Sequence, residues 1–198
     1  VQETIDYMKT LNADWYAVNV ALPIVGTEMF EQYANQGVLD HSSRDWETNF
    51  QGRNFDTPEF TADEILEIAY RTNLEVNFIN NRQMRLGDWD LALEAFNDVL
   101  STHPYHVIAT YMGMQCLKNL GRIEEANARF EKIKHLIEDV ATSREMMRKY
   151  GYLVPELLKI LGKFHNRLID DGAKNKTSKD KQKIFMYSQS FNTGSDML

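Results

Sequence analysis

Few side chains in this 198-residue sequence have the types and spacing that chemistry requires. Cys116 is the only cysteine, so the chain alone cannot form an internal disulfide or a Cys-rich site for zinc or an iron–sulfur cluster. A single thiol also favours a reducing, cytoplasmic compartment. The sequence contains no Gly-x-Ser-x-Gly, no His-Glu-x-x-His and no phosphate-binding glycine loop, which argues against a self-contained hydrolase.

Two groups of residues are candidates for a metal site. His103 and His106 stand close together at the junction of two predicted helices, but no carboxylate or cysteine is placed to complete a site. We interpret one as a polar loop histidine and the other as a packed one. His41, Asp45 and Glu47 form the second group, and their spacing is not typical of a metal-ligand set. The sequence therefore predicts no catalytic and no metal-ligating residue.

A pattern that recurs after 34 residues organises the middle of the chain. The pairs at this spacing are Leu86 and Leu120, Gly87 and Gly121, Ala92 and Ala126, Phe96 and Phe130, and Val99 and Ile133. Each copy predicts the end of one helix, a tight turn at Gly, and a second helix that turns a small residue and an aromatic ring inward. A fixed period of this length is typical of stacked helical repeats.

The two copies resemble tetratricopeptide repeats, over residues 73–106 and 107–140. Residues 87–92 (Gly-Asp-Trp-Asp-Leu-Ala) and 121–126 (Gly-Arg-Ile-Glu-Glu-Ala) match that family's turn and second helix, and Pro104 matches its terminal proline. The second copy lacks this proline, and both first helices lack the usual Trp and Leu-Gly. Two copies are fewer than such arrays need, so we expect support from the preceding segment and from a C-terminal helix.

This resemblance implies a concave groove that binds a protein segment. Its candidate partner-binding residues are Asn77, Asn80, Asn81 and Arg85, on the first helix of the first copy. The alternative is that these four side chains are ordinary solvent-exposed positions.

The N-terminal part predicts one helix–strand–helix unit. Residues 1–11 read as an amphipathic helix, and residues 15–22 read as a buried strand that Pro23 stops. Thr27 is the expected N-cap of a helix that ends at Gly37. A lone strand needs a sheet, so we expect its partner strands upstream of Val1, and we expect the chain to be a fragment of a longer protein.

Later elements are predicted mainly from helix start and stop signals. Residues 38–60 form a long polar segment with three aromatic rings, which we expect to cover a neighbouring surface. Thr61 and Glu64 form a capping box for a helix that continues to Leu86, with a bend near residues 72–73. A further helix runs from Thr142 to about Gly151. Residues 155–168 then form either a helix that closes the repeat stack or a partner-binding helix.

The N-terminal residues also resemble the end of a radical SAM catalytic domain. The match runs over Glu-Thr-Ile-Asp (3–6), Asp-Trp (14–15) and Leu-Pro-Ile-Val-Gly-Thr-Glu-Met-Phe (22–30), where a late barrel strand leads into a Pro-x-x-Gly-Thr-Glu turn and a helix. It points to Fe–S oxidoreductases that often carry a cobalamin-binding domain. The resemblance implies a 4Fe–4S cluster and S-adenosylmethionine in the parent, with cobalamin in some members.

The cluster motif Cys-x-x-x-Cys-x-x-Cys is absent from this sequence, so we expect the chain itself to be catalytically inert. By the same resemblance, Asn19, Val20, Ala21 and Leu22 would lie near the adenine of S-adenosylmethionine. The alternative is that these four residues only fill a barrel wall.

The net charge of −7 is unevenly distributed. Residues 142–185 hold 11 of the 22 Lys/Arg and 5 of the 29 Asp/Glu, a net of +6, which leaves 11 basic and 24 acidic residues elsewhere, a net of −13. An acidic body disfavours nucleic-acid binding, and no apolar run is long enough to span a membrane. We interpret the basic stretch as part of a solvated tail.

Together these patterns predict a mainly α protein of tetratricopeptide-like helical hairpins, preceded by a short α/β remnant of a barrel edge. The predicted divisions are residues 1–60 (barrel edge and covering loop), 61–169 (repeats with capping helix) and 170–198 (flexible basic tail). The first functional hypothesis is a non-catalytic C-terminal region of a radical SAM enzyme, of methyltransferase or oxidoreductase type, that covers the active site or recognises a substrate or partner. The alternative is a standalone adaptor that binds a protein segment. Expected partners are the rest of the chain's own polypeptide, and either another protein or a second copy.

Overall fold

The computed structural model describes residues 1–39 and 55–162. The secondary structure of these residues is helical, with no strand among them, and this confirms the mainly α class. The chain divides into two compact units. The described part of the first comprises Val1–Tyr16 and residues 73–162, and that of the second comprises residues 17–39 and 55–72. The first 16 residues fall in the same unit as the helical hairpins, and the divisions expected from the sequence stay predictions.

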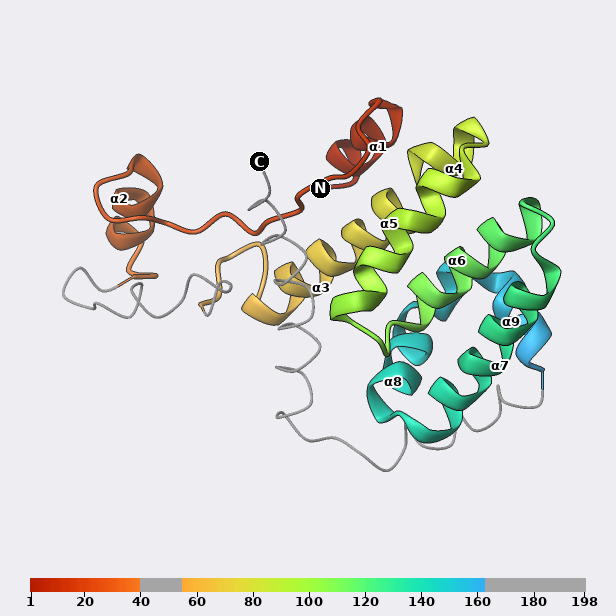
Figure 1. Ribbon diagram of the computed structural model, residues 1–198. Coiled ribbons are helices and arrows are strands. Elements are labelled where there is room, and N and C mark those ends of the chain that lie inside the picture. The colour runs from red at the N-terminus through yellow and green to blue at the C-terminus, as the bar shows by residue number, and fades with distance from the viewer. Residues whose placement is uncertain (40–54, 163–198) are drawn as a thin grey trace. The chain divides into compact units, whose positions relative to one another are not determined.

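The first unit consists of helices, and from η2 to α9 they follow one another through short connections (Figure 1). In chain order they are α1 (Gln2–Thr10), the π-helix η2 (Leu74–Ile79), α4 (Arg82–Leu86), α5 (Trp89–Thr102), α6 (Val107–Asn119), α7 (Ile123–Asp139), α8 (Ala141–Tyr150), the short 3-10 helix η3 (Gly151–Leu153) and α9 (Pro155–Leu161). Helix α6 packs against both α5 and α7. Residues 107–114 of α6 are all buried, because this helix is largely apolar on every side.

Two helical hairpins follow the 34-residue pattern. Gly87 and Gly121 end the first helix of each hairpin with φ of 80° and 73°, a left-handed conformation that glycine adopts without a Cβ penalty. The paired positions Ala92 and Ala126 are fully buried, and Phe96 is buried between the hairpins' helices. Phe130 is only half-buried, with the Lys134 ammonium 5.3 Å from its ring centroid. The helix–turn–helix prediction is confirmed, and membership of the tetratricopeptide class stays a prediction.

The prediction of one continuous helix from Thr61 to Leu86 is wrong in its second half, where the helix is interrupted. Helix α3 (Ala62–Asn73) continues as the π-helix η2, and the helical run then stops at Asn80. Asn81 begins α4 instead, because its side-chain oxygen accepts the Met84 N–H at 3.1 Å. An asparagine side chain competes with helical backbone hydrogen bonds and favours such a cap.

The second unit contains α2 (Glu28–Asn35) and the part of α3 up to Thr72. Thr27 caps α2 by accepting the Phe30 N–H at 3.3 Å, as predicted. The predicted capping box is also present: the Thr61 N–H donates to Glu64 Oε2 at 2.8 Å, and the Glu64 N–H donates to Thr61 Oγ1 at 3.2 Å. In this unit Phe30 and Tyr70 are buried.

The strand predicted over residues 15–22 is not confirmed, because this stretch has no regular secondary structure. Its residues alternate between half-buried and exposed from Tyr16 to Leu22, as those of an extended chain do. A strand is defined by pairing with another strand, and the described residues contain none.

The remaining predictions concern other helices and residues outside the described ranges. Helices α1 and α8 lie where they were expected, and Pro155 stands in the first turn of α9. His41, Asp45, Glu47 and most of the polar segment around them lie outside the described residues, as do the end of the predicted capping helix and the tail of residues 170–198. Within the described ranges, no helix combines the length and the apolar character that crossing a membrane requires.

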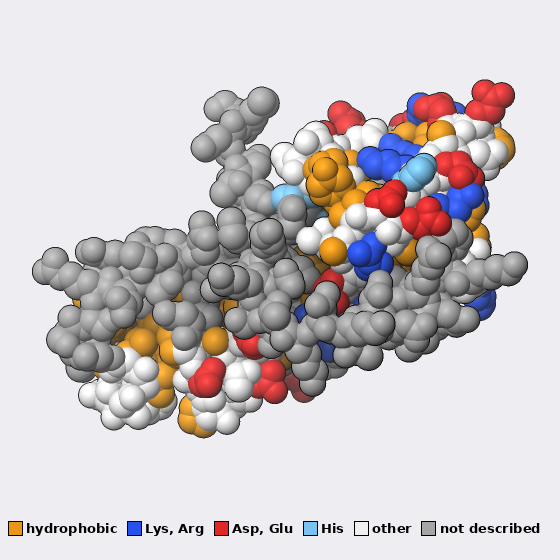
Figure 2. Space-filling view, turned by 90° about the horizontal axis from the view of Figure 1, so that it is seen from below, with side chains coloured by type: hydrophobic (Ala, Val, Ile, Leu, Met, Phe, Trp, Pro, Cys, Tyr) orange, Lys and Arg blue, Asp and Glu red, His pale blue; other side chains and the backbone are white. Residues whose placement is uncertain are grey.

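Charged side chains of both signs are interspersed on the face of the molecule in Figure 2. Ion pairs one turn apart occur along the helices of the first unit: Arg122–Glu125 at 2.7 Å, Lys134–Glu131 at 2.6 Å, Arg148–Glu145 at 2.5 Å and Lys159–Glu156 at 2.7 Å. Such exposed pairs each contribute at most about 1 kcal/mol.

Candidate segment-binding face

The side-chain amide of Asn77 holds the main chain of Tyr16 by two hydrogen bonds. The Tyr16 N–H donates to Asn77 Oδ1 at 2.8 Å, and Asn77 Nδ2 donates to the Tyr16 carbonyl oxygen at 2.9 Å. The two residues are 61 positions apart in sequence. An amide side chain offers an acceptor and a donor in one plane, as a peptide group does. Asn77 therefore makes the two hydrogen bonds to the Tyr16 main chain that a neighbouring strand would otherwise make.

Asn77 lies in the π-helix η2 and is 99% buried. Single-turn π-helices are rare and are found frequently at functional sites. The Asn77 carbonyl oxygen also accepts a hydrogen bond from Asn81 Nδ2 at 3.0 Å. This bond ties the π-helix to the start of α4 and so helps to hold Asn77 in place. We call the two hydrogen bonds between the Asn77 side chain and the Tyr16 main chain the clamp.

Trp15, the residue before the clamped one, packs against an aromatic cluster. Its ring lies edge-to-face on Phe78, with centroids 5.4 Å apart and planes at 70°. Phe78 is fully buried and stacks on Phe96 at 5.8 Å and on His106 at 4.9 Å. Because the cluster belongs to the core of the hairpins, it presents a fixed surface to Trp15.

Asp14 is held by two side chains from the first turn of α4. Its Oδ1 accepts hydrogen bonds from Arg82 Nη1 at 2.8 Å and from Gln83 Nε2 at 2.7 Å. The Asp14 side chain is 72% exposed, so this ion pair orients the segment more than it stabilises it.

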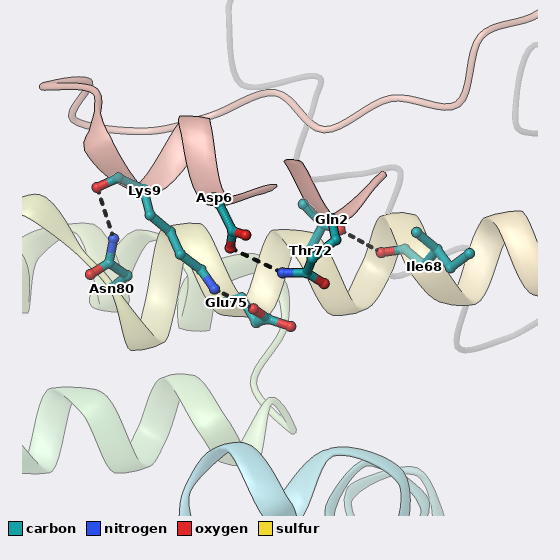
Figure 3. Close-up of polar contacts among 7 residues, drawn as sticks. All are labelled: Gln2, Asp6, Lys9, Ile68, Thr72, Glu75 and Asn80. Carbon is teal, nitrogen blue, oxygen red and sulfur yellow. Dashed lines mark hydrogen bonds and ion pairs between the residues drawn. The ribbon is translucent and has the colours of Figure 1, made fainter. Parts of the chain in front are cut away.

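The end of α1 is attached to the same region (Figure 3). Lys9 Nζ lies 2.6 Å from Glu75 Oε2, and Asn80 Nδ2 donates to the Lys9 carbonyl oxygen at 3.4 Å. The Tyr16 hydroxyl donates back to the Met8 carbonyl oxygen at 2.7 Å, which satisfies one of the acceptors left open at the helix end. We call Val1–Tyr16 the N-terminal segment. The docking face is the set of residues that hold it: Glu75, Asn77, Phe78, Asn80, Arg82 and Gln83.

The four predicted partner-binding residues, Asn77, Asn80, Asn81 and Arg85, therefore have different roles in the structure. Asn77 and Asn80 hold the main chain of the N-terminal segment. Asn81 is buried and caps α4, so its side chain is used within the fold. Arg85 is exposed near the end of α4.

Sequence reasoning missed four members of this face: Glu75, Phe78, Arg82 and Gln83. The signal that could have found their partners is the Asp14-Trp15 pair, in which a large aromatic ring stands next to a carboxylate shortly after α1. Large aromatic rings contribute much of the burial energy at contacts between segments, so a Trp there needs a surface to pack on.

The predicted cofactor-binding residues lie in the second unit. Asn19 and Ala21 are exposed, and Val20 and Leu22 are half-buried. In the part of the chain that the structure describes, no group of three or more His, Cys, Asp or Glu side chains is arranged to hold a metal ion.

His103, His106 and Cys116 are all buried in the first unit. His106 Nδ1 accepts the Ala109 N–H at 3.0 Å and so caps α6. Burial, with the nearby His103 charge as a smaller cause, lowers the pKa of His106 to about 3. Burial raises the pKa of the Cys116 thiol to about 11, which makes it a poor nucleophile at neutral pH. His106 therefore serves capping and packing within the fold.

Comparison of the chain with protein-family models, with curated proteins and with solved structures finds no match.

Proposed function

We propose that this chain is a non-catalytic helical-repeat module that holds an extended polypeptide segment by its main chain. The pair of hydrogen bonds between Asn77 and the Tyr16 backbone supports this most directly. Because the contact is made to backbone groups, it holds a chain in extended form whatever the side chain at that position. No group of the docking face is arranged to react with a substrate, so binding is the activity that its chemistry favours.

The held segment is the one that leads into the strand-like residues 16–22. We therefore propose that the module is the C-terminal, non-catalytic region of a radical SAM Fe–S oxidoreductase and that it holds the connection to the last barrel strand. The support is the Pro-x-x-Gly-Thr-Glu run that follows those residues. In such a parent, a 4Fe–4S cluster and S-adenosylmethionine, with cobalamin in some members, would be bound by residues upstream of Val1. The tetratricopeptide-like hairpins would then cover the catalytic domain or recognise its substrate or partner.

The second candidate is an adaptor that binds a segment of another protein. The observation that favours it is the length of chain between the N-terminal segment and the docking face, 61 residues from Tyr16 to Asn77. The clamp thus holds a segment that is remote in sequence, and the same contacts would suit a segment from a second polypeptide.

Amide hydrogen exchange of the full chain tests the clamp. We expect the Tyr16 N–H to exchange slowly and Asn77→Ala to accelerate its exchange about tenfold or more, since each lost hydrogen bond contributes about 1 kcal/mol. The α6 amides should keep their protection. Asn119→Ala is the matched control, because Asn119 bonds only within its own helix end, to the Gln115 carbonyl oxygen. Equal Tyr16 exchange in wild type and Asn77→Ala would refute the clamp.

The reading frame upstream of Val1 tests the proposed parent. A Cys-x-x-x-Cys-x-x-Cys motif within the preceding few hundred codons supports the radical SAM enzyme. A frame that opens just before Val1 would instead leave the adaptor as the better proposal.

A further inference from the structure

We infer that the docking face selects its segment by an acidic–aromatic pair: an Asp or Glu and then a Trp, directly before the residue whose backbone Asn77 holds. The ligand is an extended segment of another polypeptide that carries this pair and competes with the chain's own Asp14-Trp15-Tyr16. The inference rests on the proposed function, because it names the class of segment that the same face takes.

The aromatic half of the selection comes from Phe78. This ring is fully buried, and stacking on Phe96 and His106 fixes its position. It meets Trp15 edge-to-face at 5.4 Å, the arrangement that the charge distribution of two aromatic rings favours. An aliphatic residue in place of Trp loses both the ring pairing and much of the buried area. This loss weakens binding by roughly tenfold.

The acidic half comes from Arg82 and Gln83. Both donate to the same Asp14 oxygen, at 2.8 and 2.7 Å, so the position is lined by two donors. A carboxylate satisfies them, and a lysine there would face the Arg82 guanidinium. The exposed setting makes the attraction weak, but it discriminates between charges of opposite sign.

The clamp adds a backbone requirement at the third position. Asn77 Oδ1 needs an N–H to accept, so every residue except proline satisfies it. The face therefore selects a three-residue pattern: acidic, Trp, and any residue other than Pro.

The chain's own segment occupies this face as a tethered competitor. Because the segment belongs to the same chain as the face, it competes at a high effective concentration, so a free peptide binds the wild-type chain weakly. Releasing the segment removes the competitor while the face stays intact. We call the full chain with Asp14→Ala and Trp15→Ala the released variant.

Fluorescence anisotropy with a labelled peptide of residues 9–22 tests the inference. We expect the peptide to bind the released variant at least tenfold more tightly than the wild-type chain. Peptides carrying Asp14→Lys or Trp15→Ala should bind the released variant roughly tenfold more weakly, and a Tyr16→Pro peptide should not bind. Asn77→Ala added to the released variant should abolish binding, whereas Asn119→Ala should not change it.

Three results would overturn the inference. One is equal binding of the parent peptide and the Trp15→Ala peptide, and another is no binding to a released variant whose α6 amides remain protected. The third is a wild-type dimer, seen by light scattering, that the release mutations dissociate, because the occupant would then be a second copy. Should the double substitution prevent folding, Tyr16→Pro in the full chain releases the segment through the backbone alone. Protection of the Tyr16 amide in the wild type separates a failure of this inference from a failure of the clamp itself.

Discussion

Acidification should destabilise the first unit through His106. The imidazole is buried, it stacks on Phe78, and its Nδ1 accepts the Ala109 N–H at the start of α6. Protonation would place a charge in the core and remove this acceptor at the same time. Burial, and to a smaller extent the nearby His103 charge, lowers the pKa of His106 to about 3 in the folded chain.

The sign and size follow from proton linkage. An unfolded histidine titrates near pH 6.5, so between pH 6.5 and 3 the unfolded chain binds more protons than the folded one. The contribution of His106 to stability is complete above pH 6.5 and is lost as the pH falls toward 3. The free energy of unfolding should fall by at most about 1.4 kcal/mol per pH unit in this window, or about 3 kcal/mol between pH 7 and pH 4.

Urea unfolding of wild type and His106→Asn at pH 7, 6, 5 and 4 measures this slope. Asparagine keeps a helix-capping oxygen but does not titrate, so the variant should be less stable at pH 7 and should depend less on pH. Burial also lowers the pKa of His103, and the substitution leaves that residue in place, so the difference between the two curves reports His106 together with its coupling to His103. His135→Asn is the control, because the His135 side chain is 76% exposed. Parallel curves for wild type and His106→Asn would refute this role.

Three further predictions concern other parts of the first unit. Gly121→Ala should lower the free energy of unfolding by about 1 kcal/mol in urea titrations, because φ is +73° and no atom lies near the new Cβ, so backbone strain acts alone; an unchanged value would contradict this. Cys116 should not react with a thiol reagent in the native chain and should react fully in urea, since its thiol is buried with a raised pKa; fast native labelling would show that α6 opens. Phe96→Ala should lower the free energy of unfolding by about 3–5 kcal/mol and Phe130→Ala by clearly less, because only Phe96 is fully buried; equal losses would mean that the two copies pack alike.

Much of the fold could be predicted because its signals are local. Thr61 and Glu64 are three residues apart, and their capping box forms as the sequence indicates. Gly87 and Gly121 each end a helix where the 34-residue pattern places the turn. Short-range signals of this kind fix where a helix begins and ends, whatever it packs against.

The segment-binding face depends on contacts that no local pattern records. Asn77 was identified as a candidate from its place on a predicted helix, but its partner Tyr16 is 61 residues away. Asn81 looked equivalent to Asn77 in the sequence, and only the break at Asn80 turns its side chain into a helix cap. Asparagine suits helix surfaces poorly and caps and turns well, so its role depends on backbone geometry that composition does not determine.

The unconfirmed strand and the unforeseen clamp have one physical cause. Main-chain N–H and C=O groups of an extended apolar stretch need partners, and the sequence shows this need from Trp15 onward. It does not show which group meets it. At Tyr16 the partner is a side chain, Asn77, and residues 17–22 belong to the other compact unit. The clamp engages the main chain of Tyr16 and does not depend on what residues 17–22 pair with. The clamp is therefore compatible with both proposed functions, and it requires only that the chain enter residue 16 in extended form.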